Sequence, residues 1–150
     1  MIKLAIDLGS SMTKIYRADT SNGIVLVEPS CVAVTGEDRE IRAIGKQAKK
    51  LIGKTSEATR IVFPVYEGKI VDSRLATAML KEFLSRIGLG KLMFKRSLTV
   101  FSVPCGLPES ALAEYRSLAR ECGLKKVAFV ETPYVSAIGS DAVLSETNPI

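Results

Sequence analysis

The fold is decided by the opening stretch of the chain, residues 2–18, which reads IKLAIDLGSSMTKIYRA. Ile2 to Ile6 is a short run of strand-forming residues, and the turn-forming segment Asp7 to Ser11 stops it. A second run covers Met12 to Ala18, and a third covers Ile24 to Val27 after a polar turn at residues 19–23. Short apolar runs joined by tight turns predict an antiparallel meander of three strands.

Two helices are predicted beyond the meander. The clearer one runs from Ser73 to Ile87, where apolar residues recur every three or four positions and Gly88 follows as a terminator. The second begins at Pro108 and ends at Gly123, with an apolar stripe that includes Leu112, Tyr115 and Leu118.

Two further strands and a last helix complete the pattern. Leu98 to Val103 is almost wholly apolar, which predicts a strand that is buried on both faces, and Val127 to Val130 predicts another buried strand. A helix is expected to start at Pro133 and to run to about residue 142. The order predicts an α/β domain whose mixed five-stranded sheet is flanked by helices.

Residues 31–72 interrupt this pattern and are expected to form a small inserted lobe, with the main unit made of residues 1–30 and 73–150. Ile44 to Ile52 predicts a short helix, with Gly53 as its C-cap. Ile61 to Val65 predicts an edge strand or a connector, because Pro64 cannot donate to a ladder.

Composition narrows the class of protein. The 150 residues are 47% apolar and 25% charged, as in one ordinary globular domain. Histidine is absent, which argues against histidine-dependent hydrolases and most zinc enzymes. A net charge of +5 suits a nucleotide, an anionic membrane surface or nucleic acid, and it distinguishes none of them.

Cysteines and apolar runs indicate the compartment. Cys31, Cys105 and Cys122 are widely spaced and form no CxxC pair, so we expect reduced and mostly buried thiols in a cytosolic protein. The N-terminus has no pattern of a secretion signal, and no apolar run approaches the ~20 residues of a membrane span. The sequence therefore predicts a cytoplasmic protein.

The turn after the first strand carries the candidate chemistry. Gly9 permits a positive φ and a close approach of the backbone to a ligand. The groups that could surround a phosphate are the backbone amides of Gly9, Ser10, Ser11 and Met12 and the hydroxyls of Ser10, Ser11 and Thr13. Asp7 is placed to hold Mg²⁺ through water. No Walker motif is present, and the alternative interpretation is a plain hairpin turn of small residues.

Six stretches, in order along the chain, resemble the MreB-type bacterial actins of the actin-like ATPase superfamily. They are IDLGSS at residues 6–11, GIVLVEPS at 23–30, AIGKQAKKLIGKT at 43–55, EGKIVD at 67–72, VPCG at 103–106, and ETP at 131–133 with AIG at 137–139. The first is similar to the first phosphate motif of the superfamily, which also includes sugar kinases and heat-shock chaperones. The second phosphate motif and the adenosine pocket of that superfamily find no match, so the resemblance covers an N-terminal half only.

The resemblance implies a fold and a function. The fold would be domain I of the actin-like, ribonuclease H-like ATPases, with residues 1–30 and 73–150 as subdomain IA and residues 31–72 as subdomain IB. The function would be an ATPase that uses ATP and Mg²⁺, forms filaments with itself and maintains cell shape. Its partners would be anionic inner-membrane lipid and cell-shape membrane proteins, at the cytoplasmic face of the membrane, and no nucleic acid is expected.

Two departures from the family pattern bear on the expected site. The family has a glutamate before Pro133 that positions the attacking water, whereas this chain has Thr132 there, with Glu131 one residue away. Threonine cannot accept the proton of a water at neutral pH, so slow hydrolysis is expected; alternatively, or in addition, Thr132 caps the helix. Phe63 and Tyr66 stand where the family usually has cations.

A membrane contact is predicted at the segment GKLMFKR, residues 90–96. Leu92, Met93 and Phe94 lie in an expected turn and are flanked by three cations, a pattern that suits insertion among anionic headgroups. Some MreB proteins insert a similar loop. The alternative is that Leu92 and Phe94 pack into the domain core.

Other functions remain open at this point. A chaperone-type ATPase domain shares the strand–turn–strand and the helix that opens at Pro133, and a small-molecule kinase shares the superfamily. A pseudo-ATPase that binds nucleotide and copolymerises with an active relative is supported by Thr132. The 150-residue chain alone is expected to release no measurable phosphate from ATP, because a phosphate held from one side binds weakly.

Overall fold

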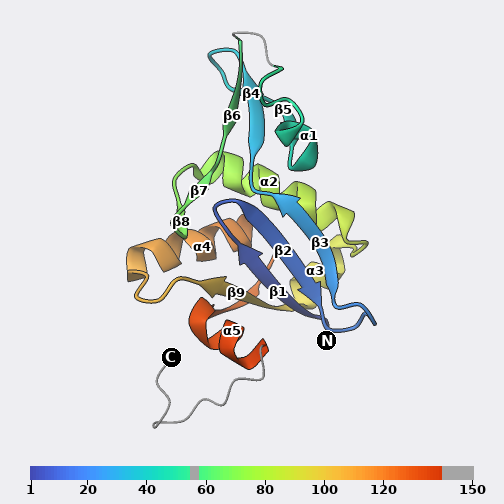
Figure 1. The fold of residues 1–150 in the computed structure, drawn as a ribbon. Coiled ribbons are helices and arrows are strands. Elements are labelled where there is room, and N and C mark those ends of the chain that lie inside the picture. The colour runs from blue at the N-terminus through green and yellow to red at the C-terminus, as the bar shows by residue number, and fades with distance from the viewer. Residues whose placement is uncertain (55–57, 140–150) are drawn as a thin grey trace.

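The main sheet has five strands in the order β10-β9-β1-β2-β3, and the computed structural model describes residues 1–54 and 58–139 (Figure 1). The meander of β1, β2 and β3 is antiparallel, whereas β9 and β10 run parallel to β1. The predicted mixed five-stranded sheet is therefore confirmed. The bounds are β1 Lys3–Leu8, β2 Met12–Arg17, β3 Ile24–Pro29, β9 Leu98–Val103 and β10 Lys126–Glu131.

Helices α2 (Ser73–Arg86) and α4 (Glu109–Glu121) cover one face of this sheet (Figure 1). The apolar stripes of both helices pack in one core with the alternate residues of the strands. At the start of α2, the Asp72 carboxylate accepts a hydrogen bond from the Leu75 amide at 2.9 Å. Gly88, at φ +71°, ends α2 as predicted.

The expectation that Leu98–Val103 is buried on both faces was wrong. Thr99, Phe101 and Val103 are buried, but the residues between them are partly exposed. β10 is an edge strand and is also only partly buried. Almost uninterrupted apolar sequence can therefore belong to a strand with one covered face, because exposed apolar residues are common on protein surfaces.

A second, three-stranded sheet follows β3, in the order β5-β4-β6, with a separate hairpin after it. Its strands are β4 Val32–Thr35, β5 Glu40–Ile44 and β6 Thr59–Val62, and the hairpin strands are β7 Val65–Tyr66 and β8 Lys69–Ile70. Val32, Val34, Val65 and Ile70 belong to the same core as the main sheet. Cys31, Ala33 and Ala48 form a smaller apolar cluster of their own.

Helix α1 (Lys46–Lys49) is shorter than the predicted helix over residues 44–52. Ile44 is paired with Val32 as the last residue of β5, so the helix begins only after Gly45. β6 is an edge strand that ends before Pro64, which confirms the interpretation of that segment.

The segment predicted as an exposed turn at residues 90–96 is instead the short helix α3 (Lys91–Arg96), so that prediction was wrong. Helix α5 spans Thr132–Gly139, and its predicted end at residue 142 lies outside the described residues. In the described ranges, no helix is long and apolar enough to cross a membrane.

All three cysteines are free thiols. Cys31 is buried and Cys122 is partly buried, but Cys105 is exposed, which corrects the expectation for that residue.

Candidate functional site

The turn Gly9-Ser10-Ser11 closes the hairpin between β1 and β2. The Gly9 amide donates to the Met12 carbonyl oxygen at 3.1 Å. A Cβ at Gly9 would lie 2.7 Å from that same oxygen, closer than real Cβ atoms come. Gly9 does not use the positive φ that glycine permits. Glycine is required here because the two backbone segments come so close.

The amides of Ser10 and Ser11 are the free donors of this turn. The Gly9 amide is used within the hairpin, where it donates to the Met12 carbonyl oxygen. Within residues 1–54 and 58–139, neither serine amide donates to a backbone carbonyl. Ser11 is exposed and Ser10 is partly exposed, so two amides and two hydroxyls are accessible to an anion.

Thr13 does not join these donors, which corrects the prediction for that residue. It is fully buried on the face that α2 and α4 cover, and its hydroxyl is hydrogen-bonded to that of Ser30 at 2.8 Å. The Ser30 amide also donates to the Ser11 carbonyl at 2.9 Å. Ser30 therefore supports the turn from behind. Sequence reasoning matched residues 23–30 to a family pattern but gave Ser30 no role.

Asp7 lies on the opposite, open face of the sheet, since its neighbours Ile6 and Leu8 point into the core. Lys14 and Ser102 are its partners on the two adjacent strands, so the three side chains share this face. The Ser102 hydroxyl is buried and has no hydrogen-bond partner among the described residues. A shallow, largely apolar depression of about 220 Å³ includes all three residues.

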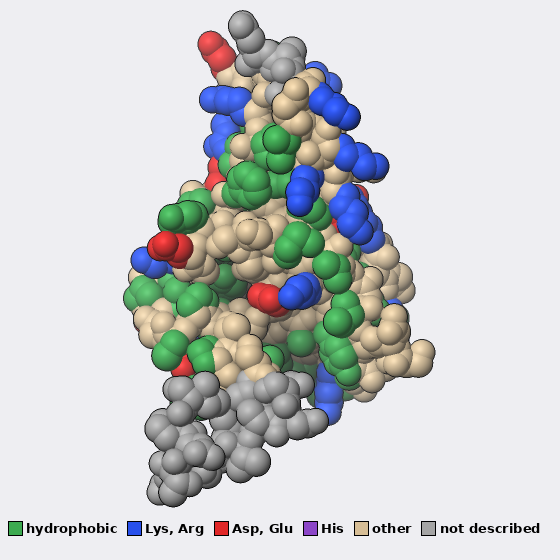
Figure 2. Space-filling view, in the orientation of Figure 1, with side chains coloured by type: hydrophobic (Ala, Val, Ile, Leu, Met, Phe, Trp, Pro, Cys, Tyr) green, Lys and Arg blue, Asp and Glu red, His purple; other side chains and the backbone are tan. Residues whose placement is uncertain are grey.

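Figure 2 looks onto this open face, where hydrophobic side chains lie among a few charged ones and basic side chains gather over the second sheet. No group of three or more acidic, cysteine or histidine side chains in the described ranges could enclose a metal ion. A single carboxylate with nearby hydroxyls suits Mg²⁺, which keeps most of its water. The donor set at Asp7 therefore fits a hydrated Mg²⁺ bound to phosphate.

The register shows that Lys14 was within reach of sequence reasoning and Ser102 was not. Lys14 lies opposite Asp7 in a tight hairpin, whose pairing follows from the turn. Ser102 reaches Asp7 through the parallel pairing of β1 with β9, more than 90 residues along the chain. No local sequence pattern predicts which residue of β9 pairs with Asp7.

Glu131 lies on the covered side of the sheet, away from Asp7. It is paired with the buried Val103, and its carboxylate accepts a hydrogen bond from the Gly106 amide at 3.2 Å. A hydrogen bond with Glu131 also raises the pKa of the Cys105 thiol. The Glu131 carboxylate is thus occupied with the loop that follows β9.

Thr132 is the first residue of α5 and is exposed. Its hydroxyl donates to the Val103 carbonyl oxygen at 3.0 Å, which ties the start of α5 to the end of β9. The hydroxyl proton is used in this bond, and a threonine oxygen is no base at neutral pH. Phe63 and Tyr66, in the positions of the expected family cations, are both exposed.

Residues 1–149 match the model of the MreB/Mbl protein family. The chain belongs to the MreB/Mbl family. It is 31% identical over 147 residues to the cell shape-determining protein MreB of Escherichia coli K12, which covers 95% of this chain and 42% of that protein. It is 30% identical over 137 residues to Mbl of Bacillus subtilis 168, covering 91% and 40%.

Solved structures agree with the family. MreB5 of Spiroplasma citri bound to AMPPNP superposes with a TM-score of 0.84 at 28% identity, over 93% of this chain and 41% of that one. The MamK double helical filament has a TM-score of 0.75 at 18% identity, over 95% and 44%, and shows the fold alone. The predicted actin-like fold and MreB resemblance are confirmed. The chain spans about two fifths of the length of the MreB and Mbl relatives it matches.

Proposed function

We propose that this chain is the N-terminal half of an MreB-type ATPase and supplies one wall of a nucleotide site. The observation that carries the proposal is the pair of free amides at Ser10 and Ser11 beside the Asp7 carboxylate. The structures of MreB5 of Spiroplasma citri bound to AMPPNP and to ADP support it, because the similarity to that protein covers 93% of this chain.

Each residue of the turn has a role in this proposal. The amides and hydroxyls of Ser10 and Ser11 bind phosphate oxygens, and Gly9 and Met12 hold the turn in shape. Asp7 orients the water shell of Mg²⁺, and Lys14 offsets phosphate charge. The magnesium ion would neutralise the phosphate charge that builds up during transfer. Base and ribose contacts would come from the rest of the family fold, so binding to this chain alone is weak.

The phosphorus resonances of ATP, followed by ³¹P NMR, test this wall. Addition of the chain is expected to shift the β- and γ-phosphate signals at millimolar concentration, and more strongly with Mg²⁺ than without. Asp7→Asn should remove the gain from Mg²⁺. Asp19→Asn, in the turn between β2 and β3, is the matched control and should leave it unchanged. Equal shifts for both variants would refute the role of Asp7.

Binding without hydrolysis is a second candidate function, and Thr132 favours it. Its hydroxyl donates to the Val103 carbonyl, and the Glu131 carboxylate lies on the covered side of the sheet. No described carboxylate therefore stands where the family's glutamate would orient the attacking water. In a fusion of this chain to the C-terminal part of a MreB relative, Thr132→Glu should raise phosphate release by about 10²-fold. Unchanged release would show that this place lies elsewhere.

The further parts of the proposal concern assembly. We propose that the protein forms filaments with itself, acts with cell-shape membrane proteins, and lies in the cytoplasm at the inner face of the membrane. Residues 1–30 with 73–150 and residues 31–72 would be subdomains IA and IB. MreB and Mbl relatives are named as cell shape-determining, and MamK forms a double helical filament.

Contact with anionic inner-membrane lipid is proposed at α3. Leu92 and Met93 are 63% and 44% exposed, next to the exposed cations Lys95 and Arg96. Phe94 is only 7% exposed and packs in the core, so the predicted insertion of Phe94 was wrong. Phe94 instead anchors the helix that presents the other two residues.

Co-sedimentation with phosphatidylglycerol vesicles tests the membrane contact. Leu92→Ser combined with Met93→Ser should abolish pelleting, whereas Ile52→Ser combined with Val71→Ser should not, although those side chains are similarly exposed. Pelleting that survives the first pair, or is lost equally in both, would contradict the proposal.

A further inference from the structure

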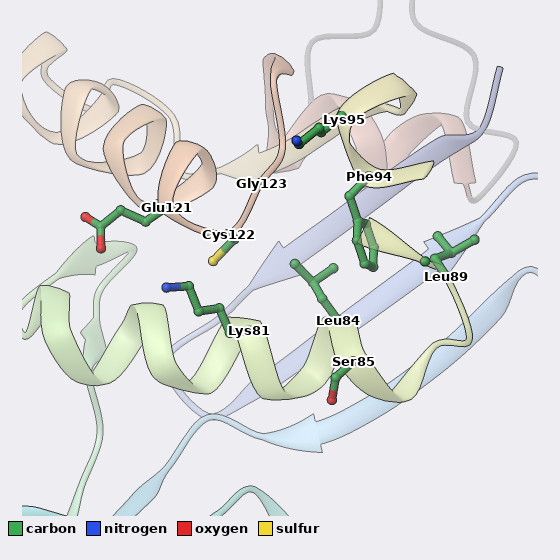
Figure 3. A pocket seen from close by; sticks show the side chains of 10 residues that line it. Lys81, Leu84, Ser85, Leu89, Phe94, Lys95, Glu121, Cys122 and Gly123 are labelled. Atoms are coloured by element: carbon green, nitrogen blue, oxygen red, sulfur yellow. The ribbon is translucent and has the colours of Figure 1, made fainter. Parts of the chain in front are cut away.

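A groove of about 680 Å³ opens between α2, α3 and the C-terminal end of α4 (Figure 3). We call it the α2–α3 groove. Its volume falls in the range of small-molecule sites, which is ~300–1,000 Å³. It lies on the covered side of the main sheet, apart from the phosphate turn, and neither the proposed ATP site nor the exposed face of α3 uses it.

The apolar part of the groove is built by Leu84 of α2, Leu89 of the following loop and Phe94 of α3. The side chains of Leu84 and Phe94 point toward each other in Figure 3, with Leu89 to one side, and each of the three is less than a tenth exposed. Cys122 belongs to the lining as well, and its thiol faces the Thr77 carbonyl oxygen at 3.8 Å. Burial raises the pKa of Cys122 to about 12, so this thiol stays neutral and adds no charge.

The charged part of the groove lies at its α4 end. Lys81 of α2 and Lys95 of α3 line it there, and in Figure 3 their amino groups point toward Cys122 and Gly123. Neither lysine forms an ion pair with another described residue. Glu121 also lines the groove, so two cations and one carboxylate leave a net charge of +1.

We propose that the α2–α3 groove binds one molecule of an anionic membrane lipid. An acyl chain would lie on Leu84, Leu89 and Phe94, and the phosphate of the headgroup would lie between Lys81 and Lys95. The amphipathic lining carries this assignment, since one end is apolar and the other is cationic. The inference rests on the proposed membrane contact, because α3 presents Leu92 and Met93 outward while its Phe94 lines the groove.

The size of the groove favours a lipid chain over a protein partner. A docked helix is about 10–12 Å wide, and a stable protein interface buries roughly 800 Å² on each partner. An open space of about 680 Å³ between α2, α3 and the end of α4 is too small for such an interface. It suits one flexible apolar chain with a single charged head.

The probe that tests this inference is monomeric lysophosphatidylglycerol with a nitroxide on its acyl chain, used below its micelle concentration and without vesicles. The nitroxide broadens nearby methyl resonances, so the signals of Leu84 and Leu89 should be lost. The methyl signals of Ala33 and Ala48, in the separate apolar cluster of the second sheet, should remain. Lysophosphatidylcholine with the same nitroxide should bind at least tenfold more weakly, because its headgroup carries no net charge.

Two variants locate the binding. Gly90→Phe, at an exposed lining position where nothing lies within 4 Å of a Cβ, should fill the space and abolish broadening, and an unchanged thermal midpoint shows that the chain still folds. Lys81→Glu combined with Lys95→Glu should weaken binding of lysophosphatidylglycerol at least tenfold, whereas Lys69→Glu on β8 is the charge control. Broadening that persists in Gly90→Phe, or that spreads evenly over surface methyls, would overturn the proposal.

The groove and the proposed membrane contact can fail separately. If Leu92→Ser with Met93→Ser abolishes vesicle pelleting but leaves the broadening intact, both hold and act through different residues. If vesicles pellet normally with Gly90→Phe and monomeric lipid never broadens Leu84, the membrane contact stands and the groove proposal falls.

Discussion

The two faces of the main sheet are made by the same strands and have opposite characters. In β1, Leu4, Ile6 and Leu8 are at most 2% exposed and pack under α2 and α4, whereas Asp7 between them faces the open side. In β9, Phe101 is buried and Ser102 lies beside Asp7. Strand alternation thus lets one segment stabilise the fold with every second residue and present polar groups with the others.

The difference between the two faces predicts which property a substitution on each face should affect. Substitutions on the covered face should cost stability, and substitutions on the open face should cost ligand binding with little effect on stability. The following variants test this separation, in order of expected effect.

The largest effect is expected for Phe101→Ala. The ring is fully buried and packs edge-on against Tyr115 at a centroid distance of 5.7 Å. Its removal leaves a cavity, so the free energy of unfolding should fall by about 3–5 kcal/mol. Urea unfolding measures this. Val100→Ala, one residue away on the open side, should cost roughly 1 kcal/mol or less, and equal losses would break the comparison.

Gly9→Ala should come next. The new Cβ would lie 2.7 Å from the Met12 carbonyl oxygen, so the backbone of the turn must move. We expect a loss of about 1–3 kcal/mol in the free energy of unfolding, together with loss of the ATP-induced ³¹P shifts. Gly90→Ala serves as the control, because nothing lies within 4 Å of a Cβ there. A Gly9→Ala chain with normal stability and normal shifts would show that the close approach is not required.

Asp72→Ala should cost about 1–2 kcal/mol at pH 7, because α2 loses its N-cap and Arg39 loses its ion pair. Burial of the Asp72 carboxylate raises its pKa, but the Leu75 amide and the Arg39 guanidinium more than offset this, so the pKa is lowered from 3.8.

A lowered pKa in the folded state means that the charged carboxylate stabilises the fold above pH 3.8. This contribution should be lost as the pH falls below that value. The difference in thermal midpoint between Asp72→Ala and the unchanged chain should therefore shrink as the pH is lowered from neutral to below 3.8. A difference that is constant with pH would assign the loss to something other than the carboxylate charge. Ser73→Ala, next to it, should change little at any pH.

The smallest effect on stability is expected for Asp7→Asn on the open face. The carboxylate forms no hydrogen bond or ion pair with another described side chain, so the free energy of unfolding should change by less than about 0.5 kcal/mol. Chemical denaturation checks this value. A loss above 1 kcal/mol would mean that Asp7 is part of the structural framework.

The parts of this structure that could be predicted from the sequence are those fixed by local pattern. The hairpin of β1 and β2, the helix that ends at Gly88 and the position of Asp7 at the end of its strand all follow from period and turn residues. The mixture of antiparallel and parallel strands followed from the alternation of helix and strand, whereas their order in the sheet was not predicted.

The predictions that failed depended on contacts between distant segments. The sequence predicts a phosphate donor at Thr13. It does not reveal that the hydroxyl bonds to Ser30 instead, because Ser30 lies 17 residues away, at the end of another strand. The sequence of residues 90–96 predicts membrane insertion of Phe94. Its packing in the same core as Leu84 cannot be inferred from that short segment alone. For Gly9 the sequence allows a positive φ and a close backbone approach, and the structure has the close approach, to the Met12 carbonyl, without the positive φ.

The central claim, that the turn between β1 and β2 binds the phosphates of a nucleotide, is tested most directly by amide NMR during titration with Mg²⁺ and AMPPNP. The amide signals of Ser10 and Ser11 should show the largest shifts and should saturate at millimolar nucleotide. The amides of α4 and α3, on the covered side, should move little. Shifts confined to the basic second sheet, or none at Ser10 and Ser11, would contradict the account.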